Sequence, residues 1–336
     1  MKTAIVTGVS GQDGAYLAKY LLGKGYRVIG ADRRRSHNPR AGLNFLGIAD
    51  QVEFINFDLL DIGNIHSIIR QYQPDEFYNL AAQSYVAVSF QQPLLTSQVN
   101  GIAVLNILEA IRLFSPTTKF YQASTSEMFG EAVSSPQSES TPFNPRSPYG
   151  IAKLYAHGMV KNYRDAHGIY GVSGILFNHE SPLRGEEFVT RKITISVAKI
   201  KSGSLDLLEL GNLAAKRDWG FAGEYVTAMW KMLQCEEPSD FVIATGETNT
   251  VRDFAHKAFA VAGFDLVWDG SDENEVGIES SSNKILVKVN SNFYRPAEVD
   301  VLVGDPGKAK IELDWEAEVK LDELVELMIK NDLEIF

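Results

Sequence analysis

Short apolar runs alternate with amphipathic stretches along the first half of the chain. Six of these runs are typical of strands buried on both faces of a sheet, and they lie at residues 3–7, 27–30, 52–57, 77–81, 119–123 and 172–177. The stretches between them carry apolar residues at helical spacing, most clearly at residues 15–22, 104–114 and 149–166. Strands and helices that alternate in this way predict an α/β fold, with a doubly wound parallel sheet of the Rossmann type.

The pattern changes after residue 177. Residues 178–203 begin with loop-forming residues and continue into a helix, and residues 218–234 also have helical spacing. A strand-like run at residues 241–245 predicts that the chain returns there to the first sheet. Residues 269–283 are rich in Gly, Ser, Asp and Glu, which is typical of a loop or a hairpin insertion.

Two domains of unequal size are predicted from these patterns. The 336 residues are enough for one large α/β unit or for two joined domains. We expect a Rossmann domain made of residues 1–177 plus about 216–246. A smaller C-terminal α/β domain would consist of about residues 178–215 plus 247–336, and an amphipathic helix at residues 321–329 would close it.

Composition and charge argue against several classes of function. Lys and Arg number 32 against 43 Asp and Glu, so the net charge is −11, whereas nucleic-acid binders show basic surfaces. The single cysteine, Cys235, allows no disulfide framework and suits a reducing cytoplasm. No cluster has metal-ligand spacing, and no apolar run has the length of a membrane span. We expect a cytoplasmic protein that uses no metal and has neither nucleic acid nor a membrane as partner.

A glycine-rich turn follows the first predicted strand and opens a helix. Residues 8–14 read Gly-Val-Ser-Gly-Gln-Asp-Gly, with the glycines spaced three and three. Glycine permits a tight turn and lets backbone amides approach a pyrophosphate at the helix N-terminus. The residues that would hold a dinucleotide at this turn are Gly8, Ser10, Gly11, Gln12 and Asp13. The alternative is a turn that serves only close contact between strand and helix.

The end of the second predicted strand bears on the choice between NAD and NADP. Asp32 lies 18 residues after Gly14, where an acid accepts hydrogen bonds from a ribose 2′-hydroxyl and favours NAD. The next residues are Arg33, Arg34, Arg35 and Ser36, and arginines clamp a 2′-phosphate. Because three cations are present, we expect NADP, and Asp32 keeps NAD as an alternative. A solvated basic loop is the remaining interpretation.

Two further strand ends add candidate cofactor contacts. Asp58 and Leu59 follow the third strand, and an acid there can take the adenine amino group or simply cap a helix. Small residues after the fourth strand let the backbone pass close beneath a cofactor, or they end a buried strand. The candidates at this second position are Leu80, Ala81, Ala82 and Ser84.

Four residues in two nearby stretches predict alcohol oxidation with an additional proton transfer. Tyr149 and Lys153 are four apart, so they share one face of a helix, with Ser147 as its cap and Pro148 in its first turn. An ammonium beside a phenol lowers a pKa that starts near ~10, which makes the phenol a proton acceptor. Thr125 can hold the same sugar oxygen. A nicotinamide alcohol dehydrogenase needs no more, so Glu127 suggests a second proton transfer, from carbon.

These motifs resemble the extended short-chain dehydrogenase/reductase superfamily. Within it, the Thr-Ser-Glu at residues 125–127 resembles the sugar-nucleotide 4,6-dehydratases, and the central serine resembles their GDP-mannose 4,6-dehydratase branch. Longer blocks also resemble that branch, at residues 11–14, 82–84, 176–185, 188–192, 216–220 and 295–300. Asp32 departs from it, because relatives usually carry an apolar or basic residue there.

The resemblance implies roles for individual residues. Thr125, Glu127 and Tyr149 would be the active-site residues, and Lys153, His179 and Arg184 would contact NADP. The GDP-mannose pocket would include Ser84, Ser126, Asn178, Val189, Lys192, Arg217, Arg295 and Glu298. The resemblance also implies a homodimer or homotetramer, with the arginine-rich loop that begins at Arg33 near the subunit interface.

The expected reaction is conversion of GDP-mannose to GDP-4-keto-6-deoxy-mannose and water. Hydride would leave carbon 4 of the sugar for bound NADP and return to carbon 6 of the same sugar. Another nucleotide-sugar dehydratase, a 4-epimerase or a 4-keto-sugar reductase of the same superfamily is the alternative enzyme. A binding protein that senses the cofactor is the alternative outside enzymes, although such proteins usually lose the tyrosine or the lysine.

Overall fold

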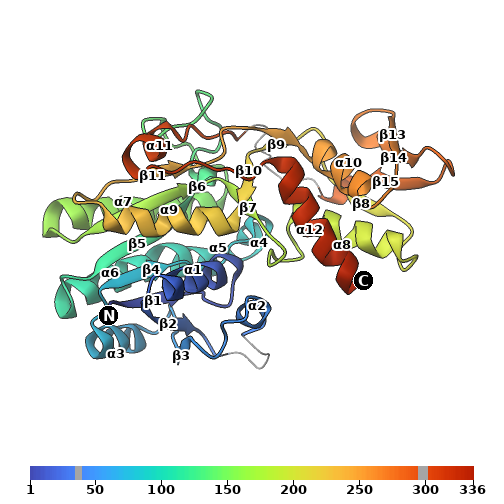
Figure 1. The fold of residues 1–336 in the computed structure, drawn as a ribbon. Coiled ribbons are helices and arrows are strands. Elements are labelled where there is room, and N and C mark those ends of the chain that lie inside the picture. Colours follow the sequence, from blue (N-terminus) through green and yellow to red (C-terminus); the bar gives the residue numbers. More distant parts are fainter. Residues whose placement is uncertain (35–39, 294–301) are drawn as a thin grey trace.

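A parallel sheet of seven strands forms the larger lobe of the protein (Figure 1). The computed structural model describes residues 1–34, 40–293 and 302–336. The sheet order is β11-β6-β5-β4-β1-β2-β3, and every neighbouring pair is parallel. Its strands are β1 (Thr3–Thr7), β2 (Arg27–Asp32), β3 (Glu53–Asn56), β4 (Glu76–Asn79), β5 (Lys119–Thr125), β6 (Gly171–Leu176) and β11 (Phe241–Ile243). The predicted doubly wound parallel sheet is confirmed.

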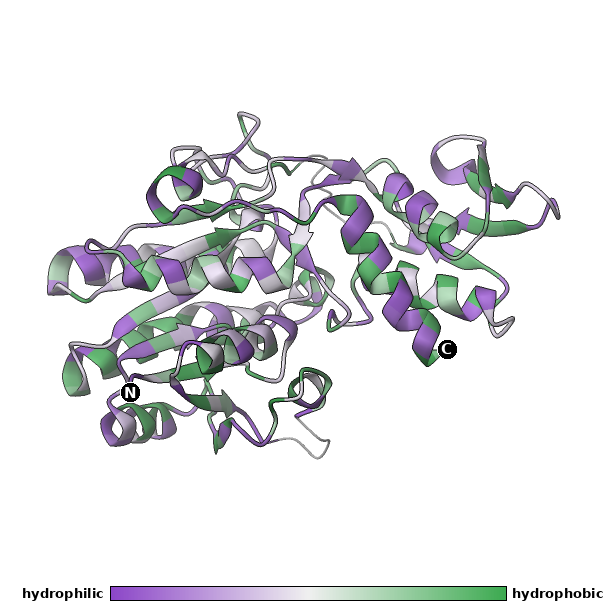
Figure 2. Cartoon of the chain, viewed as in Figure 1, coloured by the Kyte–Doolittle hydropathy of each residue, from purple (hydrophilic) through white to green (hydrophobic). Residues whose placement is uncertain are grey.

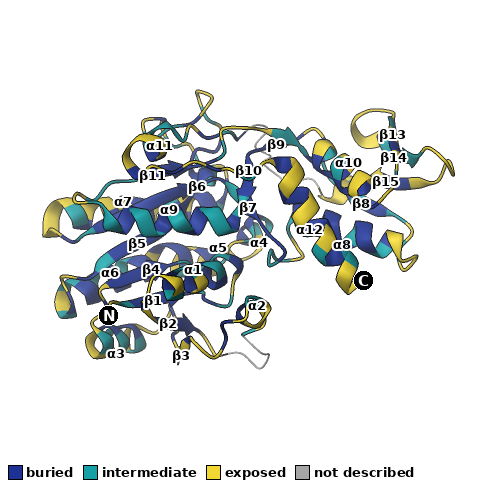
Figure 3. Ribbon diagram, viewed as in Figure 1, coloured by how far each residue is buried: buried dark blue, intermediate teal, exposed yellow. Residues whose placement is uncertain are grey.

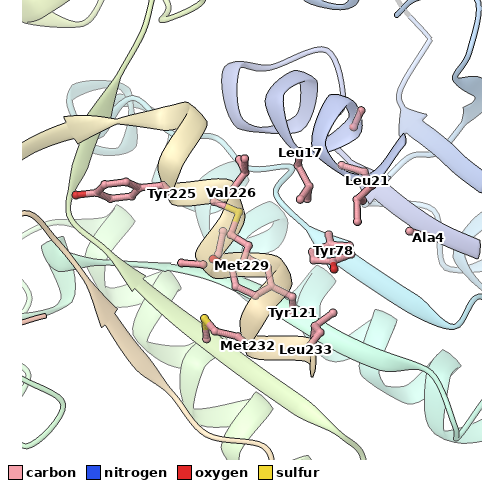
Figure 4. Close-up of a cluster of buried hydrophobic side chains, with 14 of the residues drawn as sticks. Ala4, Leu17, Leu21, Tyr78, Tyr121, Tyr225, Val226, Met229, Met232 and Leu233 are labelled. Atoms are coloured by element: carbon pink, nitrogen blue, oxygen red, sulfur yellow. The ribbon is translucent and has the colours of Figure 1, made fainter. Parts of the chain in front are cut away.

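Helices cover both faces of this sheet. One face carries α1 (Gln12–Gly23) and α9 (Ala222–Gln234), and the other carries α3 (Ile62–Tyr72), α6 (Ala103–Phe114) and α7 (Pro148–His167). Alternate strand residues serve the two faces: Val6 of β1 packs on the α1 side and Ile5 on the α6 side. Figure 4 shows the first of these cores, where side chains of α1 and α9 meet Tyr78 and Tyr121 of the sheet.

The smaller lobe packs three helices against a second sheet. The helices are α8 (Val189–Lys201), α10 (Val251–Val261) and α12 (Leu321–Ile335). The four-stranded sheet has the order β13-β14-β15-β8, from β13 (Leu266–Asp269), β14 (Val276–Glu279), β15 (Ile285–Val289) and β8 (Leu208–Leu210). The hairpin insertion predicted at residues 269–283 therefore takes the form of antiparallel strands. Each helix buries its apolar stripe and exposes its polar one (Figures 2 and 3).

Short strands link the two lobes. Strand β7 (Asn178–Glu180) pairs in parallel with β10 (Trp219–Phe221), and β9 (Lys216–Arg217) pairs with β12 (Asn249–Thr250). The helix predicted for residues 218–234 is wrong at its start, because residues 219–221 hydrogen-bond to β7 and the Trp219 side chain is buried. The helix begins at Ala222. The domain boundaries given above stay a prediction.

The remaining elements are short. They are α2 (Ala41–Phe45), α4 (Val86–Gln91), α5 (Pro93–Ser97), η1 (Gln98–Ile102), η2 (Ser126–Met128), η3 (Asp272–Asn274), η4 (Ser291–Phe293) and α11 (Gly307–Leu313). Two of them, α5 and η1, run on into α6 as one helical stretch, Pro93–Phe114, which is long and apolar enough to cross a membrane by length and composition alone. Half of its most apolar window is buried inside the protein, as in a core helix. The cytoplasmic location stays a prediction.

Candidate active site

The glycine-rich turn has a geometry that larger residues would disrupt. Gly8 has a φ of +68°, and a Cβ at this position would lie 2.9 Å from the Cα of Ala81. At Gly14 a Cβ would lie 2.3 Å from the carbonyl oxygen of Gly8. Helix α1 begins directly after Gly11, so the free amides of its first turn point toward the end of β1. An anion such as a pyrophosphate fits this position.

A pocket of about 580 Å³ opens at the carboxyl ends of β1, β2, β3 and β4. In a doubly wound sheet this is the edge where ligands bind, at the point where the strand order reverses between β1 and β4. The pocket brings together thirteen of the predicted cofactor contacts, namely Gly8, Ser10, Gly11, Gln12, Asp13, Arg33, Asp58, Leu59, Leu80, Ala81, Ala82, Ser84 and Arg184. Its size, its glycine cradle and its helix N-terminus suit a dinucleotide.

Other predicted cofactor contacts lie elsewhere. Arg34, Tyr149, Lys153 and His179 are not among the residues that line this pocket, although Arg34 directly follows the lining residue Arg33. Arg35 and Ser36 lie outside the described residues. These four placements show that the pocket holds one part of the predicted site, while the residues around Tyr149 form a second part.

His179 contacts the glycine-rich turn through Asp13 and Gln12. Its Nε2 lies 2.8 Å from an Asp13 carboxylate oxygen, and its Nδ1 lies 2.7 Å from the Phe177 carbonyl oxygen. Burial would lower the pKa of His179, but the Asp13 carboxylate raises it above its usual value. Burial likewise would raise the pKa of Asp13, and the His179 imidazole lowers it. Gln12 donates a hydrogen bond to the His179 carbonyl oxygen at 3.0 Å, so both turn residues are held in place.

Asp32 lines the pocket at the end of β2. Its carboxylate accepts hydrogen bonds from the Ser10 hydroxyl and, at 2.9 Å, from the Arg33 backbone amide. The side chain is nearly buried, so its charge acts at short range on whatever occupies this end of the pocket. The acid and the first of the three arginines therefore face the same space.

Several lining residues were not predicted from the sequence. They are Ala31, Phe57, Leu60, Gln83, Leu95, Val99, Leu183, Gly185, Glu187 and Phe188. Most of them are apolar side chains whose sequence pattern is that of ordinary core residues, so no local signal distinguishes them. Phe188 could have been found, because it lies four residues after the predicted contact Arg184, whose guanidinium is 3.5 Å from the centre of the Phe188 ring.

The predicted catalytic residues converge beside this pocket. Thr125 ends β5, Glu127 lies in the η2 turn that follows, and Tyr149 stands in the first turn of α7. The start of α7 is fixed as predicted: Pro148 is at its first position, and the Ser147 hydroxyl accepts a hydrogen bond from the Gly150 amide at 3.0 Å. A Cβ on Gly150 would lie 2.7 Å from the Glu127 carbonyl oxygen, so the helix and the turn are in close contact.

The pKa of Tyr149 differs from the sequence prediction. Burial raises this pKa to about 12, a hydrogen bond with Thr125 lowers it in part, and the Glu127 carboxylate raises it further. Burial also lowers the pKa of Lys153 to about 8, and its ammonium donates a 2.8 Å hydrogen bond to the Ala123 carbonyl oxygen. The predicted lowering of the phenol pKa by Lys153 is therefore wrong for this structure, because burial disfavours the charged forms of both side chains.

The predicted substrate contacts are spread over the second lobe and the strands that link the lobes. Asn178 begins β7, and Val189 and Lys192 lie on the first turn of α8. The Lys192 ammonium lies 3.5 Å from the centre of the Phe293 ring, and burial lowers its pKa. Arg217, on β9, is buried and donates to the Lys216 carbonyl oxygen at 2.8 Å.

The remaining substrate candidates have different settings. Ser126 is buried in the η2 turn directly before Glu127, whereas Ser84 is exposed and lines the pocket. Arg295 and Glu298 lie outside the described residues. Within residues 1–34, 40–293 and 302–336, no group of three or more His, Cys, Asp or Glu side chains is arranged to hold a metal ion.

Comparisons with known proteins bear on the family and on the fold. The family model described as GDP-mannose 4,6 dehydratase matches residues 5–328. A relative from Cricetulus griseus named GDP-mannose 4,6 dehydratase is 50% identical, over 99% of this chain and 92% of its own length. Among solved structures, RMD from Pseudomonas aeruginosa, complexed with NADPH, has a TM-score of 0.79 at 20% identity and covers 100% of both chains. The dTDP-glucose 4,6-dehydratase from Bacillus anthracis, in complex with NAD, has a TM-score of 0.80 at 18% identity and covers 98% of this chain and 96% of its own. The two structures support the fold.

Proposed function

Because the chain belongs to the GDP-mannose 4,6-dehydratase family, we propose that it converts GDP-mannose to GDP-4-keto-6-deoxy-mannose and water. The observation within the site that carries this proposal is Glu127, a carboxylate on the turn that touches the start of the Tyr149 helix. Oxidation of an alcohol needs Tyr149 and Thr125, whereas loss of water needs a further base and acid beside the same sugar.

Tyr149 and Thr125 act on the hydroxyl at carbon 4. Tyr149 takes the hydroxyl proton as that carbon is oxidised. Thr125, which is hydrogen-bonded to the phenol of Tyr149, holds the same sugar oxygen. A pKa near 12 makes a phenolate costly, so the proton moves to Tyr149 only as negative charge develops on the sugar oxygen. Lys153, whose ammonium is hydrogen-bonded to the Ala123 carbonyl oxygen, holds the first turns of α7 against β5 and supplies positive charge nearby.

A bound nicotinamide dinucleotide supplies the hydride acceptor for carbon 4 and, once reduced, the hydride donor for carbon 6. The residues that would hold it are those of the glycine-rich turn and of the pocket described above. Two features of this chain fit such a group: the cradle that a Cβ at Gly8 or Gly14 would fill, and the helix N-terminus behind it.

Glu127 carries out the elimination. The ketone formed at carbon 4 acidifies the proton on carbon 5, and Glu127 removes that proton. The same side chain then returns it to the hydroxyl that leaves carbon 6 as water, because Ser126 cannot donate a proton as readily as an acid can. When carbon 6 takes up hydride, carbon 5 takes up one proton, which balances the proton that Tyr149 removed from the carbon 4 hydroxyl. Substrate contacts are proposed for Ser84, Ser126, Asn178, Val189, Lys192 and Arg217, and for Arg295 and Glu298 outside the described residues.

We propose NADP as the resident dinucleotide. Arg33 lines the pocket at the tip of β2, where a cation favours a 2′-phosphate. Asp32 opposes it there, so replacing Asp32 with alanine should strengthen NADP binding relative to NAD. Equilibrium binding of both dinucleotides to wild type and Asp32→Ala measures this ratio. Release of NAD alone from the denatured wild-type protein would contradict the NADP assignment.

We also propose a homo-oligomer. Leu94 of α5, Ile102 of η1 and Ile151 of α7 are exposed apolar side chains on elements that pack together. Gly101 lies directly against Tyr155, since a Cβ on this glycine would be 3.3 Å from Tyr155 Cδ1. An apolar face of this kind on two adjacent helices suits a second copy of the chain. A role for the arginine-rich loop near the interface rests largely on residues outside those described.

The decisive test is incubation of the purified protein with GDP-mannose, without added dinucleotide, followed by mass spectrometry of the product. Loss of one water is the expected result. An unchanged mass with a changed sugar configuration would indicate a 4-epimerase. In a parallel incubation to which reduced dinucleotide is added, its consumption would indicate a reductase. An untouched substrate in a sample loaded with dinucleotide would refute the proposal.

A further inference from the structure

An extended segment at residues 302–305, called here the strap, lies beside the end of β11 and the turn that follows Glu127. Leu302 of the strap is fully buried and belongs to one apolar cluster with Met128 and Phe129, which directly follow Glu127. At Gly304 a Cβ would lie 2.3 Å from the Ala244 Cβ, so the strap is seated closely on the end of β11. A displacement of the strap would therefore also displace the turn that carries Glu127.

Gln137 ties the strap to the loop between Glu127 and Tyr149. The backbone amide of Gln137 donates to the Val303 carbonyl oxygen at 2.9 Å, and the Gln137 side-chain oxygen accepts from the Val303 backbone amide at 3.0 Å. Its own carbonyl oxygen accepts from the Asp305 amide at 2.8 Å. Gln137 is buried, and its side-chain amide donates to the Ser134 carbonyl oxygen at 2.9 Å. Gln137 thus joins the strap to the loop between Glu127 and Tyr149, through its backbone and through its side chain.

Asp218 ties the strap to the strand of Arg217, the residue directly before it. One Asp218 carboxylate oxygen accepts from the Thr245 amide at 2.9 Å and the Thr245 hydroxyl at 2.7 Å. The other accepts from the Gly246 amide at 3.0 Å and the Gly304 amide at 3.3 Å. The side chain is fully buried. A buried carboxylate with four donors holds their segments in one arrangement, because each donor would otherwise lose a strong partner.

We propose that Gln137 and Asp218 are positioning residues that, through the strap, set the position of Arg217 relative to Glu127. The inference rests on the proposed function, in which Arg217 contacts the nucleotide sugar and Glu127 acts on its carbon 5. Neither Gln137 nor Asp218 lines the dinucleotide pocket. Their effect is therefore on how the substrate is held over the catalytic turn, and a displacement of about 1 Å there can cost roughly 100-fold in rate.

The variant Asp218→Asn tests the arm of the strap that leads to Arg217. An amide keeps the shape but turns an NH₂ group toward backbone donors, so the KM for GDP-mannose should rise roughly tenfold or more while the affinity for dinucleotide changes by less than about twofold. Asp240→Asn is the matched control. Asp240 precedes β11 at its other end and accepts from the Ser173 amide at 2.8 Å and from Arg164. The Asp240→Asn variant should have a lower unfolding temperature and an unchanged KM for GDP-mannose.

The variant Gln137→Met tests the other arm, because it preserves the length of the side chain but removes the side-chain bonds to Val303 and Ser134 and leaves the backbone bonds to the strap in place. We expect a fall mainly in kcat. If the strap acts as one unit, the double variant Gln137→Met with Asp218→Asn should lose about as much kcat/KM as the more impaired single variant. If the two sites were independent, the fold-losses of the single variants would multiply. Multiplying effects, or an Asp218→Asn variant with the KM of the wild type, would overturn the proposal.

A readout that does not depend on catalysis separates this inference from the proposed function. Hydrogen exchange followed by mass spectrometry should show faster exchange in peptides covering residues 131–147 for Asp218→Asn and not for Asp240→Asn. Equal exchange in the two variants would refute the strap even if GDP-mannose is the substrate. If exchange is faster in Asp218→Asn but the wild-type protein leaves GDP-mannose unchanged, the proposed function is refuted. The structural role of the strap is then still supported.

Discussion

At the scale of single residues, the site is governed by a conflict between burial and charge. Tyr149 and Lys153 are both buried, and burial moves their pKa values to about 12 and about 8, toward the neutral form in each case. Spacing along a helix predicts that the two side chains share a face, but it says nothing of how much water reaches them. Charge on either group is therefore favoured only when substrate and cofactor bring a partner for it.

Glu127→Gln should separate the two proton transfers. The amide cannot take the carbon 5 proton, so oxidation at carbon 4 should continue while loss of water falls by roughly 100-fold or more. In a single turnover the reduced dinucleotide would accumulate, visible by its near-ultraviolet absorbance, and deuterium from solvent would not enter carbon 5. Tyr149→Phe is the control, because it should prevent reduction of the dinucleotide altogether. Unimpaired water loss in the glutamine variant would remove Glu127 from the mechanism.

Lys153→Met should stabilise the fold near neutral pH while it lowers activity. The pKa of Lys153 falls from 10.5 in the unfolded chain to about 8 in the folded protein, so the folded state binds its proton less tightly. Stability from the neutral form is fully present above pH 10.5 and is lost as pH falls through about 8.

The methionine variant avoids this loss, so its free energy of unfolding near neutrality should exceed that of the wild type by up to roughly 3 kcal/mol. Urea unfolding at neutral pH and above pH 10.5 measures the difference, which should shrink at the higher pH. A variant that is less stable than the wild type at neutral pH would show that the bond from Lys153 to Ala123 outweighs the burial of charge.

At the scale of elements, the start of α7 matters more than its length. Pro148 and the Ser147 cap fix where the helix begins, and Tyr149 stands within its first turn. The sequence predicted this start because capping signals are local. It did not predict that residues 219–221 form strand β10 before α9 begins, because the pairing of β10 with β7 brings together segments about forty residues apart.

Ser147→Ala should lower both stability and turnover. Loss of the cap bond to Gly150 should reduce the free energy of unfolding by about 1 kcal/mol and let the first turn fray around Tyr149. Thr250→Ala is the matched control, since Thr250 caps α10 in the second lobe with a 3.0 Å bond from the Asp253 amide. The two variants should lose similar stability in urea unfolding, and only Ser147→Ala should lose kcat. If the two variants had the same kcat, the Ser147 cap would have no specific role in catalysis.

At the scale of the whole molecule, two cores meet at the site. The first lies on the faces of the seven-stranded sheet, and the second lies among α8, α10, α12 and β15. Short strands link the two lobes, and a few buried hydrogen bonds hold the strap, so we expect these bonds to influence how a bound substrate is oriented.

Leu94→Arg should weaken self-association. Leu94 is 80% exposed on α5, and a charge there would be buried without a partner if this face meets a second copy. Ile311→Arg is the control, because Ile311 is 85% exposed on α11, away from this face. Size-exclusion chromatography with light scattering should show a smaller species for Leu94→Arg alone. The same assembly in both variants would exclude this face as the interface.

The sequence by itself determined the parallel sheet, the glycine-rich turn and the helix face that Tyr149 and Lys153 share, because these features depend on periodicity and on spacings of a few residues. The strand ends then bring thirteen of the predicted cofactor contacts to one pocket, as parallel strands must.

Only the tertiary structure decided the pKa of Tyr149, the support of Asp13 by His179 and the strap between Gln137 and Asp218. These depend on burial and on contacts between residues far apart in the chain. Such contacts leave no periodic pattern along the sequence, since the chain must first close its loops before either partner feels the other.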